Sequence, residues 1–325
     1  MRLPAIYSTL SVESLKEWIA HYYDFGDSVD ITFYCRNVSD TYLLTTAERQ
    51  FALKVNRVNW RADEAIVEEL TAIRHMDRSG VGVALPVPRS DGKWITHIPA
   101  PEGSRSAMLY EWARGRAPDY TNSDHMHRYG ELVARLHAAG DALRLSDARP
   151  RLDAAYLLDI PLQRIRSRLK RLPAVAPSVA RDLESLAERT QRNMSRAVEK
   201  LRGWGFCHGD IWANNARLDG ERLVLFDFDF CGPGWTVFDV ATYRWHTWSR
   251  GSEAVAWSPF LEGYLRIRPE AEAMLEYLGL FMVLRHLWTT AHFVGRLPET
   301  GAYFLSDDDL ENLVPICDQL ESLRV

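Results

Sequence analysis

The stretch that decides the fold is "CHGDIWANN" (207–215). It places His208 two positions before Asp210, and Asn215 five positions after that aspartate. An aspartate on a loop can accept a proton from a substrate hydroxyl, and an amide oxygen five positions later can bind a metal ion. Alone, each residue is more simply a loop or capping residue, so the spacing of the whole set carries the interpretation.

A second acidic segment follows closely, "LVLFDFDFCGPG" (223–234). If it is a strand, its period of two puts Asp227 and Asp229 on one face and the phenylalanines on the other. Carboxylates leaving a buried strand are costly unless they are paired or bind a cation. We therefore expect a hard metal ion with oxygen ligands where "CGPG" turns the chain.

The two segments together match one kind of chemistry. Asp210 supplies a base, Asn215 a neutral oxygen and Asp227 a charged one, in that chain order. Phosphoryl transfer from a nucleotide needs such a set, because a hydroxyl must be positioned and Mg²⁺ must bind the phosphates. The spacing therefore favours a nucleotide-dependent phosphotransferase.

The composition of the chain disfavours other functional classes, such as nucleic-acid binders and membrane proteins. The 325 residues are 46% hydrophobic, which is enough for two lobes, and the formal net charge of −5 does not mark a nucleic-acid binder. The four cysteines lack metal-ligand spacing and do not form a disulfide scaffold. The first residues contain no apolar signal core, and no stretch is long enough to cross a bilayer. We expect a cytoplasmic chain with no membrane or nucleic-acid partner.

Periodicity along the chain predicts strands first and helices later. The predicted elements of the first third are a helix over 11–23, strands over 29–35, 41–46 and 50–58, a helix over 62–76, and two strands in "KWITHI" and "SAMLYEW". After about residue 113 helical spacing dominates, interrupted by the acidic segments. Segregated strands and helices indicate an α+β fold and disfavour a doubly wound sheet.

"CHGDIWANN" and "LFDFDFCGPGWTVFDVA" resemble the catalytic and metal segments of the aminoglycoside phosphotransferase and choline kinase family. The resemblance implies a protein-kinase-like bilobal fold, with a small antiparallel-sheet N-lobe, one pairing helix and a large, mostly helical C-lobe. It implies that Asp210 is the catalytic base and that Asn215 and Asp227 are the Mg²⁺ ligands. The supporting residues that it implies are His208, Asp229 and Asp239.

The resemblance extends to the first third of the chain. "FALKV" resembles the strand whose lysine contacts the ATP phosphates, which implies this role for Lys54. "VEELTAIRHM" resembles the helix whose glutamate pairs with that lysine; Glu69 fits best and Glu68 is the alternative. The implied lobes are an N-lobe over 1–107, a hinge over 108–115 and a C-lobe over 116–325.

Two segments would complete the nucleotide site. "MLYEWARG" occupies the hinge position, so backbone groups from Tyr110 to Trp112 are expected to meet adenine. The loop "CRNVSDTY" (35–42), expected to cover the phosphates, has no glycine. Its backbone N–H groups and the side chains of Asn37 and Ser39 are the candidates for that contact.

The phosphate acceptor is less well defined by the sequence. Aromatic and basic residues follow the metal segment and recur late in the chain. The candidates for the acceptor side are Trp212, Tyr243, Trp245, Arg285 and Trp288. An aromatic box of this kind could hold an amine cation, whereas aromatics at helical spacing also form cores.

The layout is similar to the stress response kinase and homoserine kinase-like branch of the family. We therefore expect an ATP- and Mg²⁺-dependent kinase that phosphorylates the hydroxyl of a small molecule. The alternatives are a Ser/Thr protein kinase, an aminoglycoside phosphotransferase, a nucleotide-binding pseudokinase and a metal-dependent hydrolase. The predicted partners are a nucleotide and a hydroxyl-bearing molecule, and the chain is expected to be a monomer or homodimer.

Overall fold

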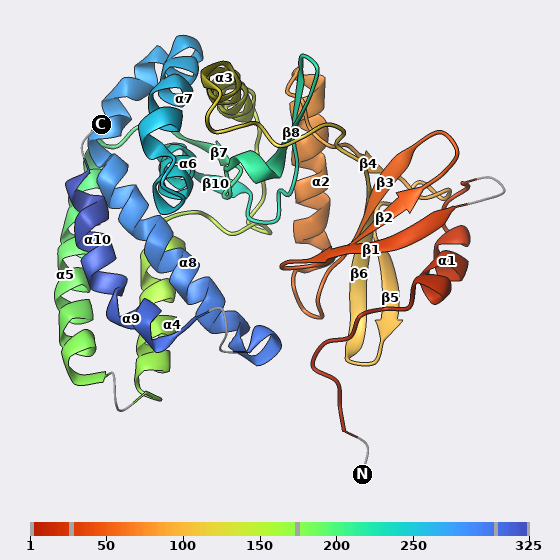
Figure 1. Cartoon of the computed structure of the whole chain (residues 1–325), viewed down its shortest axis with the longest axis horizontal. Coiled ribbons are helices and arrows are strands. Elements are labelled where there is room, and N and C mark those ends of the chain that lie inside the picture. Colours follow the sequence, from red (N-terminus) through yellow and green to blue (C-terminus); the bar gives the residue numbers. More distant parts are fainter. Residues whose placement is uncertain (1–2, 26–28, 173–175, 302–304, 324–325) are drawn as a thin grey trace. The chain divides into compact units, whose positions relative to one another are not determined.

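The computed structural model describes residues 3–25, 29–172, 176–301 and 305–323 (Figure 1). The chain forms two compact units, one made by residues 1–115 with 217–226 and the other by 116–216 with 227–325. In the part of the chain that the structure describes, no helix combines the length and apolarity needed to cross a bilayer.

The first unit is built on a mostly antiparallel sheet with two helices. Its strand order is β1-β2-β3-β6-β4, and β5 pairs with β6. The strands are β1 (Asp30–Arg36), β2 (Asp40–Thr45), β3 (Gln50–Val55), β4 (Pro86–Val87), β5 (Thr96–Ala100) and β6 (Gly103–Glu111), and the helices are α1 (Val12–Ala20) and α2 (Asp63–Arg78). Every paired strand of this sheet runs antiparallel to its neighbour, and β2 and β3, the strands predicted over 41–46 and 50–58, pair with each other.

The two helices cover opposite faces of this sheet. Leu109 of β6 belongs to a core cluster with Leu15 of α1, whereas its neighbour Met108 packs with Ile66 and Leu70 of α2. Adjacent residues of a strand point to opposite faces, so α1 and α2 lie on different sides. The alternating burial of β2 and β3 follows from the same arrangement.

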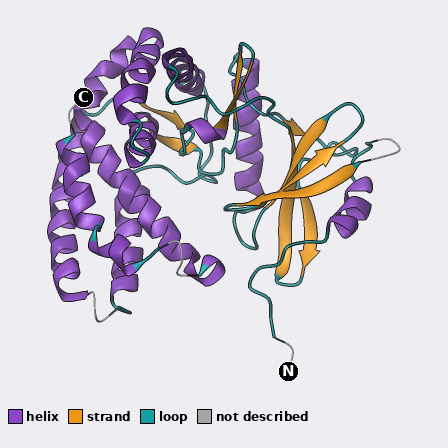
Figure 2. Ribbon diagram, viewed as in Figure 1, coloured by secondary structure: helices purple, strands orange, loops and turns teal. Residues whose placement is uncertain are grey.

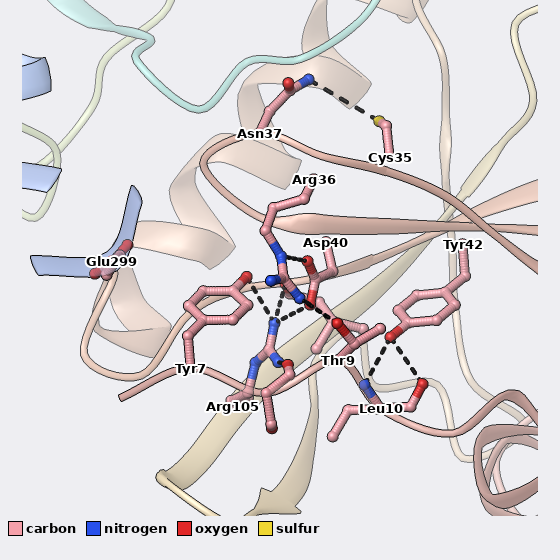
Figure 3. A network of polar contacts seen from close by, with 12 residues as sticks. Tyr7, Thr9, Leu10, Cys35, Arg36, Asn37, Asp40, Tyr42, Arg105 and Glu299 are labelled. Carbon is pink, nitrogen blue, oxygen red and sulfur yellow. Dashed lines mark hydrogen bonds and ion pairs between the residues drawn. The ribbon is translucent and has the colours of Figure 1, made fainter. Parts of the chain in front are cut away.

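A buried ion pair joins two strands of the sheet, and its arginine also binds the N-terminal segment (Figure 3). Arg105 of β6 donates to Asp40 of β2 at 2.9 Å, and both side chains are 0% exposed. Arg36 donates to the same carboxylate at 2.7 Å. The other N–H groups of Arg105 donate to the carbonyl oxygens of Ser8, Val55 and Asn56 and to the hydroxyl of Tyr7. These bonds satisfy a guanidinium that burial would otherwise leave costly.

The second unit is mainly helical (Figure 2). Its α-helices are α3 (Ser123–Gly140), α4 (Ile160–Leu169), α5 (Ala176–Lys200), α6 (Val237–Ser249), α7 (Glu253–Ile267), α8 (Leu278–Thr300), α9 (Asp307–Glu311) and α10 (Leu313–Ser322). Between them lie η1 (Ala155–Asp159), η2 (Ala213–Asn215) and η3 (Pro269–Tyr277), and the antiparallel pair β7 (Trp204–Cys207) and β10 (Gly232–Trp235). The hairpin of β8 (Ala216–Asp219) and β9 (Arg222–Leu225) lies largely in the residues grouped with the first unit. Sheet and helices are thus segregated, as the α+β expectation requires.

One buried carboxylate connects the helices to the loop after β7. Asp239 of α6 is fully buried and accepts hydrogen bonds from the backbone N–H groups of His208, at 2.6 Å, and Gly209, at 2.8 Å. Nε2 of His137 on α3 lies 3.0 Å from the same carboxylate, and its Nδ1 lies 2.7 Å from the hydroxyl of Tyr264 on α7. The expectation that Asp239 supports this loop therefore has a direct structural basis.

Removing Arg105 should destabilise the protein strongly. Arg105→Met removes the buried partner of Asp40 and leaves the more exposed Arg36, and breaking a buried ion pair typically costs about 3–5 kcal/mol of unfolding free energy. Arg49→Met is the matched control, because Arg49 and its partner Glu111 are largely exposed, and such a pair contributes about 0–1 kcal/mol. Urea unfolding of both variants measures the difference. Equal losses would contradict a stabilising role for the buried pair.

Asp239→Asn should also lower the free energy of unfolding, by about 3–5 kcal/mol. The reason is that an amide has a single acceptor oxygen, which cannot replace the contacts of the carboxylate with His208, Gly209 and His137. Asp141→Asn serves as the control, since Asp141 lies half-exposed at the end of α3 and pairs with Arg268. We expect a change of about 0–1 kcal/mol there. Indistinguishable urea midpoints for the two variants would rule out the proposed support.

Candidate active site

The loop after β7 is fixed by bonds to its backbone. Its carbonyl at Trp212 accepts from the hydroxyl of Tyr129 at 2.9 Å, and the N–H of Ala213 donates to the hydroxyl of Tyr120 at 3.2 Å. Burial raises the pKa of both tyrosines, so their hydroxyl groups stay neutral. With the bonds from Asp239, this loop is held from several elements of the second unit.

Gly209 brings the loop against the second acidic segment. Its φ of +83° lies in the left-handed region, and a Cβ there would stand 2.3 Å from the carbonyl oxygen of Phe230. No side chain fits this approach, which explains the glycine of "HGD". The rings of His208 and Phe228 lie 4.5 Å apart, so residues 208–210 and 228–230 are packed side by side.

Asp210 is surrounded by hydrogen-bond donors. Its Oδ1 accepts from Nη2 of Arg285 at 2.5 Å and lies 3.5 Å from Nε2 of His246. Its Oδ2 accepts from Nδ2 of Asn215 at 3.0 Å. Burial alone would raise the pKa of Asp210, but the charge of Arg285 and the bond to His246 outweigh it and hold this pKa well below its usual range. The carboxylate is therefore ionised, as a proton acceptor must be.

The amide of Asn215 is oriented by the same loop. Its Nδ2 donates to both the carbonyl oxygen and the side chain of Asp210, each at 3.0 Å. Both bonds use the nitrogen, so the amide oxygen is the atom that a cation could take. Asp210 and Asn215 are therefore brought together as the spacing of the motif predicts.

Asp227 differs from the expectation. The strand β9 ends at Leu225, and Asp227 has a left-handed φ of +66°, which no strand residue adopts. The prediction that Asp227 and Asp229 share one strand face is wrong, because the backbone turns at Asp227 and the N–H of Cys231 closes a turn onto Phe228. Asp229 is buried, at 4% exposure, whereas Asp227 is only partly buried.

These residues fit a hard divalent cation. An amide oxygen and a carboxylate are the ligands that Mg²⁺ takes alongside water and phosphate oxygens. Within the described residues, no three or more His, Cys, Asp or Glu side chains form a group that could hold a metal ion. A metal held by Asn215 and Asp227 would thus need further ligands from a bound substrate or water, as nucleotide-bound Mg²⁺ does.

A buried arginine that the motif analysis missed shapes the acidic segment. Arg149 is 1% exposed, and its Nη2 donates to the carbonyl oxygens of Phe228, at 3.1 Å, and Asp229, at 2.8 Å. Its Nε donates to the carbonyl oxygen of Cys231 at 2.9 Å. Arg149 lies about eighty residues earlier in the chain than the carbonyl groups that it binds, so no local motif signals it.

In the first unit, Lys54 and Glu69 share one side of the sheet. Lys54 is directly opposite Met108, so it lies on the face that α2 covers. Glu69 of α2 is 3% exposed and accepts from the hydroxyl of Tyr110 at 3.2 Å, whereas Glu68 is more exposed. Burial thus favours Glu69 over Glu68 as the partner, and the pairing with Lys54 stays a prediction.

The remaining nucleotide candidates are partly engaged within the chain. The hydroxyl of Ser39 is buried and donates to Oδ1 of Asn56 at 2.8 Å, so a phosphate contact would break that bond. The N–H of Asn37 closes the loop by donating to the carbonyl of Ser39. In the hinge, the N–H of Trp112 donates to the carbonyl of Gln50. The nucleotide contacts of Asn37, Ser39, Tyr110 and Trp112 stay predictions.

Several acceptor-side candidates lie around Asp210. Trp212 stacks on His246 at a centroid distance of 4.9 Å, and Trp245 lies 5.0 Å from the same imidazole. The guanidinium of Arg285 lies over Trp245 and Trp288. Burial lowers the pKa of His246 to about 4 although its bond to Asp210 opposes the shift, so this imidazole is neutral.

Tyr243 is not part of this group. It is fully buried, its ring stacks on Phe260 at 3.7 Å, and its hydroxyl donates to the carbonyl of Ala256. The assignment of Tyr243 to the acceptor side is wrong, because helical spacing alone does not distinguish the core face of α6 from a ligand face. His246, three positions later, contacts Asp210 instead.

Known proteins resemble the chain over most of its length. Residues 35–277 match the model of the phosphotransferase enzyme family. A protein of Deinococcus radiodurans is 36% identical over 303 residues, covering 92% of this chain and 86% of the relative. The homoserine kinase of Methylobacillus glycogenes is 23% identical, covering 94% and 92% of the two chains.

Solved structures show the same fold. An amicoumacin kinase in complex with AMP-PNP and Ca²⁺ superimposes with a TM-score of 0.72 at 21% identity, covering 95% of this chain and 92% of the other. The structure of a microcompartment-associated aminopropanol kinase superimposes with a TM-score of 0.67 at 21% identity, and 96% of each chain is covered. The kinase-like fold expected from the two acidic segments is confirmed. With its family match and its relatives, the chain belongs to the phosphotransferase enzyme family and is a kinase-like phosphotransferase.

Proposed function

We propose that this enzyme transfers the γ-phosphoryl group of ATP to the alcohol hydroxyl of a small molecule, with Asp210 as the base. The observation that carries the proposal is the arrangement of Asp210. It is ionised, its loop is held by Asp239, and its Oδ2 is fixed by Asn215 while Oδ1 faces the acceptor-side cluster. This is the geometry of an oriented proton acceptor.

The reaction balances with this one base. The acceptor oxygen forms a bond to the γ-phosphorus, the bond from that phosphorus to the β-phosphate oxygen breaks, and ADP leaves. The hydroxyl proton passes to Asp210. Because the transition state for such transfers is loose, positioning of the hydroxyl and stabilisation of charge contribute most of the catalysis.

The proposed cofactors are ATP and Mg²⁺. Asn215 and Asp227 would hold the metal, which supplies neutralisation of the charge on the phosphate oxygens. Lys54, on the α2 face of the sheet, is the proposed contact of the α- and β-phosphates. Glu69 would hold that lysine in place, and its burial supports this role.

The names of the relatives support a small-molecule acceptor. The homoserine kinase relative and the amicoumacin and aminopropanol kinase structures are all named for small molecules. We rank a small molecule first, a protein Ser/Thr second and an aminoglycoside third. Cytoplasmic location and a monomeric or homodimeric state remain part of the proposal.

A pseudokinase and a hydrolase make different predictions from a kinase. A pseudokinase would show a rise in melting temperature with Mg-ATP but no ADP release with any acceptor. A metal-dependent hydrolase would release phosphate without needing ATP or Lys54. The ionised, oriented Asp210 favours the kinase, because a protein that only senses nucleotide has no use for a base.

Asp210→Asn should reduce kcat by about 10²–10⁴, the usual effect of losing a general base. The substitution preserves size, so binding of Mg-ATP measured by thermal shift should persist. Asp219→Asn, at an exposed position of the β8 hairpin, is the control and should keep wild-type turnover. ADP release reports both. Wild-type kcat in Asp210→Asn would exclude Asp210 as the base.

Asp227→Asn should raise the Mg²⁺ concentration needed for half-maximal turnover by at least about tenfold, by analogy with weakened metal sites. Asn tolerates a left-handed backbone, so the change removes charge without strain. Asp227→Gly, which also accepts this φ but lacks the oxygen, should be at least as defective. A magnesium titration of ADP release is the measurement. An unaltered Mg²⁺ requirement in both variants would show that Asp227 does not bind the metal.

A further inference from the structure

Arg285 has an unsatisfied donor next to the catalytic carboxylate. It is 4% exposed, its Nη1 donates to the carbonyl of Gly209 at 3.1 Å, and its Nη2 donates to Asp210 at 2.5 Å. Its Nε–H has no hydrogen-bond partner among the described residues. A buried N–H of a charged group without a partner is costly and calls for an explanation.

Other unsatisfied donors belong to rings that lie near this guanidinium or near its neighbour His246. The indole N–H groups of Trp212 and Trp245 are buried without a partner in the described chain, and so are both ring nitrogens of His286. The guanidinium carbon of Arg285 lies 5.5 Å from the centre of the Trp245 ring, and the His286 ring lies 6.0 Å from that ring. These residues together hold four buried N–H groups without an acceptor, because a neutral imidazole carries one N–H. Oxygen atoms of a ligand could accept from them.

The same cluster is unsuited to a cationic ligand. Arg285 covers the rings of Trp245 and Trp288, and Arg250 lies over Trp212 at 4.5 Å. The aromatic faces that could hold an amine are thus occupied by the guanidinium groups of the chain itself. Asp210 is ion-paired with Arg285, Arg250 adds a positive charge near the rings, and the carboxylate of Asp309 lies close enough to His286 to interact with it. The unsatisfied donor of Arg285 and the covered aromatic faces favour an anion over an amine at Arg285.

We propose that the acceptor alcohol carries a carboxylate, and that Arg285 binds this group and so determines specificity. The proposal rests on the proposed kinase function. Because the guanidinium that would bind the acid also donates to Asp210, an acid bound there places a nearby hydroxyl of the same molecule at Oδ1 of the base. Oxygens of the acid would also accept from the unsatisfied indole N–H groups.

Matched pairs of alcohols that differ only in the carboxylate test this proposal. Serine is compared with ethanolamine, homoserine with the aminopropanol that remains when its carboxylate is removed, and glycerate with ethylene glycol. We expect the acid of at least one pair to exceed its partner by about 10–100-fold in kcat/KM, as expected for losing a charge-assisted bond. The last pair lacks an amine, so it separates the effect of the carboxylate from that of the amine.

Substitutions of Arg285 show whether this residue causes the preference. Arg285→Gln should lower kcat with every acceptor, because Asp210 loses a partner. It should also bring the ratio of kcat/KM for the acid to kcat/KM for its decarboxylated partner close to one. Arg285→Lys should retain part of the preference for the acid, since lysine keeps the positive charge but lacks the planar set of N–H donors of a guanidinium. Arg268→Gln is the control, because Arg268 pairs with Asp141 and Glu270, and its ratio should equal that of the wild type. A role limited to orienting the base would change kcat and leave the ratio intact.

The outcomes separate this inference from the proposed function. Absence of both Mg-ATP binding and phosphorylation of any acceptor would overturn the kinase proposal itself. Phosphorylation of the decarboxylated members as efficiently as the acids would overturn the carboxylate proposal. An unchanged ratio in Arg285→Gln would overturn the role of Arg285, and neither result would touch the kinase proposal. If ATP binds but none of the three acids is phosphorylated or raises the melting temperature, the carboxylate proposal is also wrong.

Discussion

The bonds that Asp239 accepts from the backbone of His208 and Gly209 are the interaction on which the active site depends. Both donors belong to a loop with a left-handed glycine, which would have many conformations if it were free. The buried carboxylate accepts hydrogen bonds from two N–H groups of the loop and faces a histidine, so it selects one of these conformations. The helices α3, α6 and α7 each contribute to this network, so much of the helical packing serves to fix the loop that carries Asp210.

Around this fixed loop, the site combines opposite charges at short range. Asp210 is the proposed proton acceptor, yet Arg285 donates to it and His246 lies beside it. A carboxylate in an apolar pocket would protonate, whereas these donors keep it charged and oriented. The Nε–H of Arg285 has no acceptor among the described residues, so it is the group that the proposed acceptor would bind. Orientation of the base and selection of the acceptor can thus involve the same arginine.

The sequence predicted the buried faces of helices and strands well, but it did not predict the turn at Asp227 or the contacts between distant residues. The helical spacing of Ile66 and Leu70 and the alternation in residues 50–55 report burial of one face, and the structure agrees. The spacing of Asp210 and Asn215 also sufficed, because the two lie on one short loop. The end of β9 was missed, since phenylalanines favour a strand and only the backbone shows that Asp227 is left-handed. Arg149 and the contact between Arg285 and Asp210 were out of reach because their partners are about 75 or more residues away in the chain.

The bonds made by Arg149 have a consequence for changing substrate preference. Arg149 donates to the carbonyl oxygens of Phe228, Asp229 and Cys231, and a backbone carbonyl is present whichever side chain a residue carries. Phe230 lies in this turn and contacts His292 and Trp288, which is one of the proposed acceptor-side residues. Laboratory evolution can therefore vary the side chain at position 230 to reshape the acceptor wall, while the backbone that presents Asp227 keeps its course.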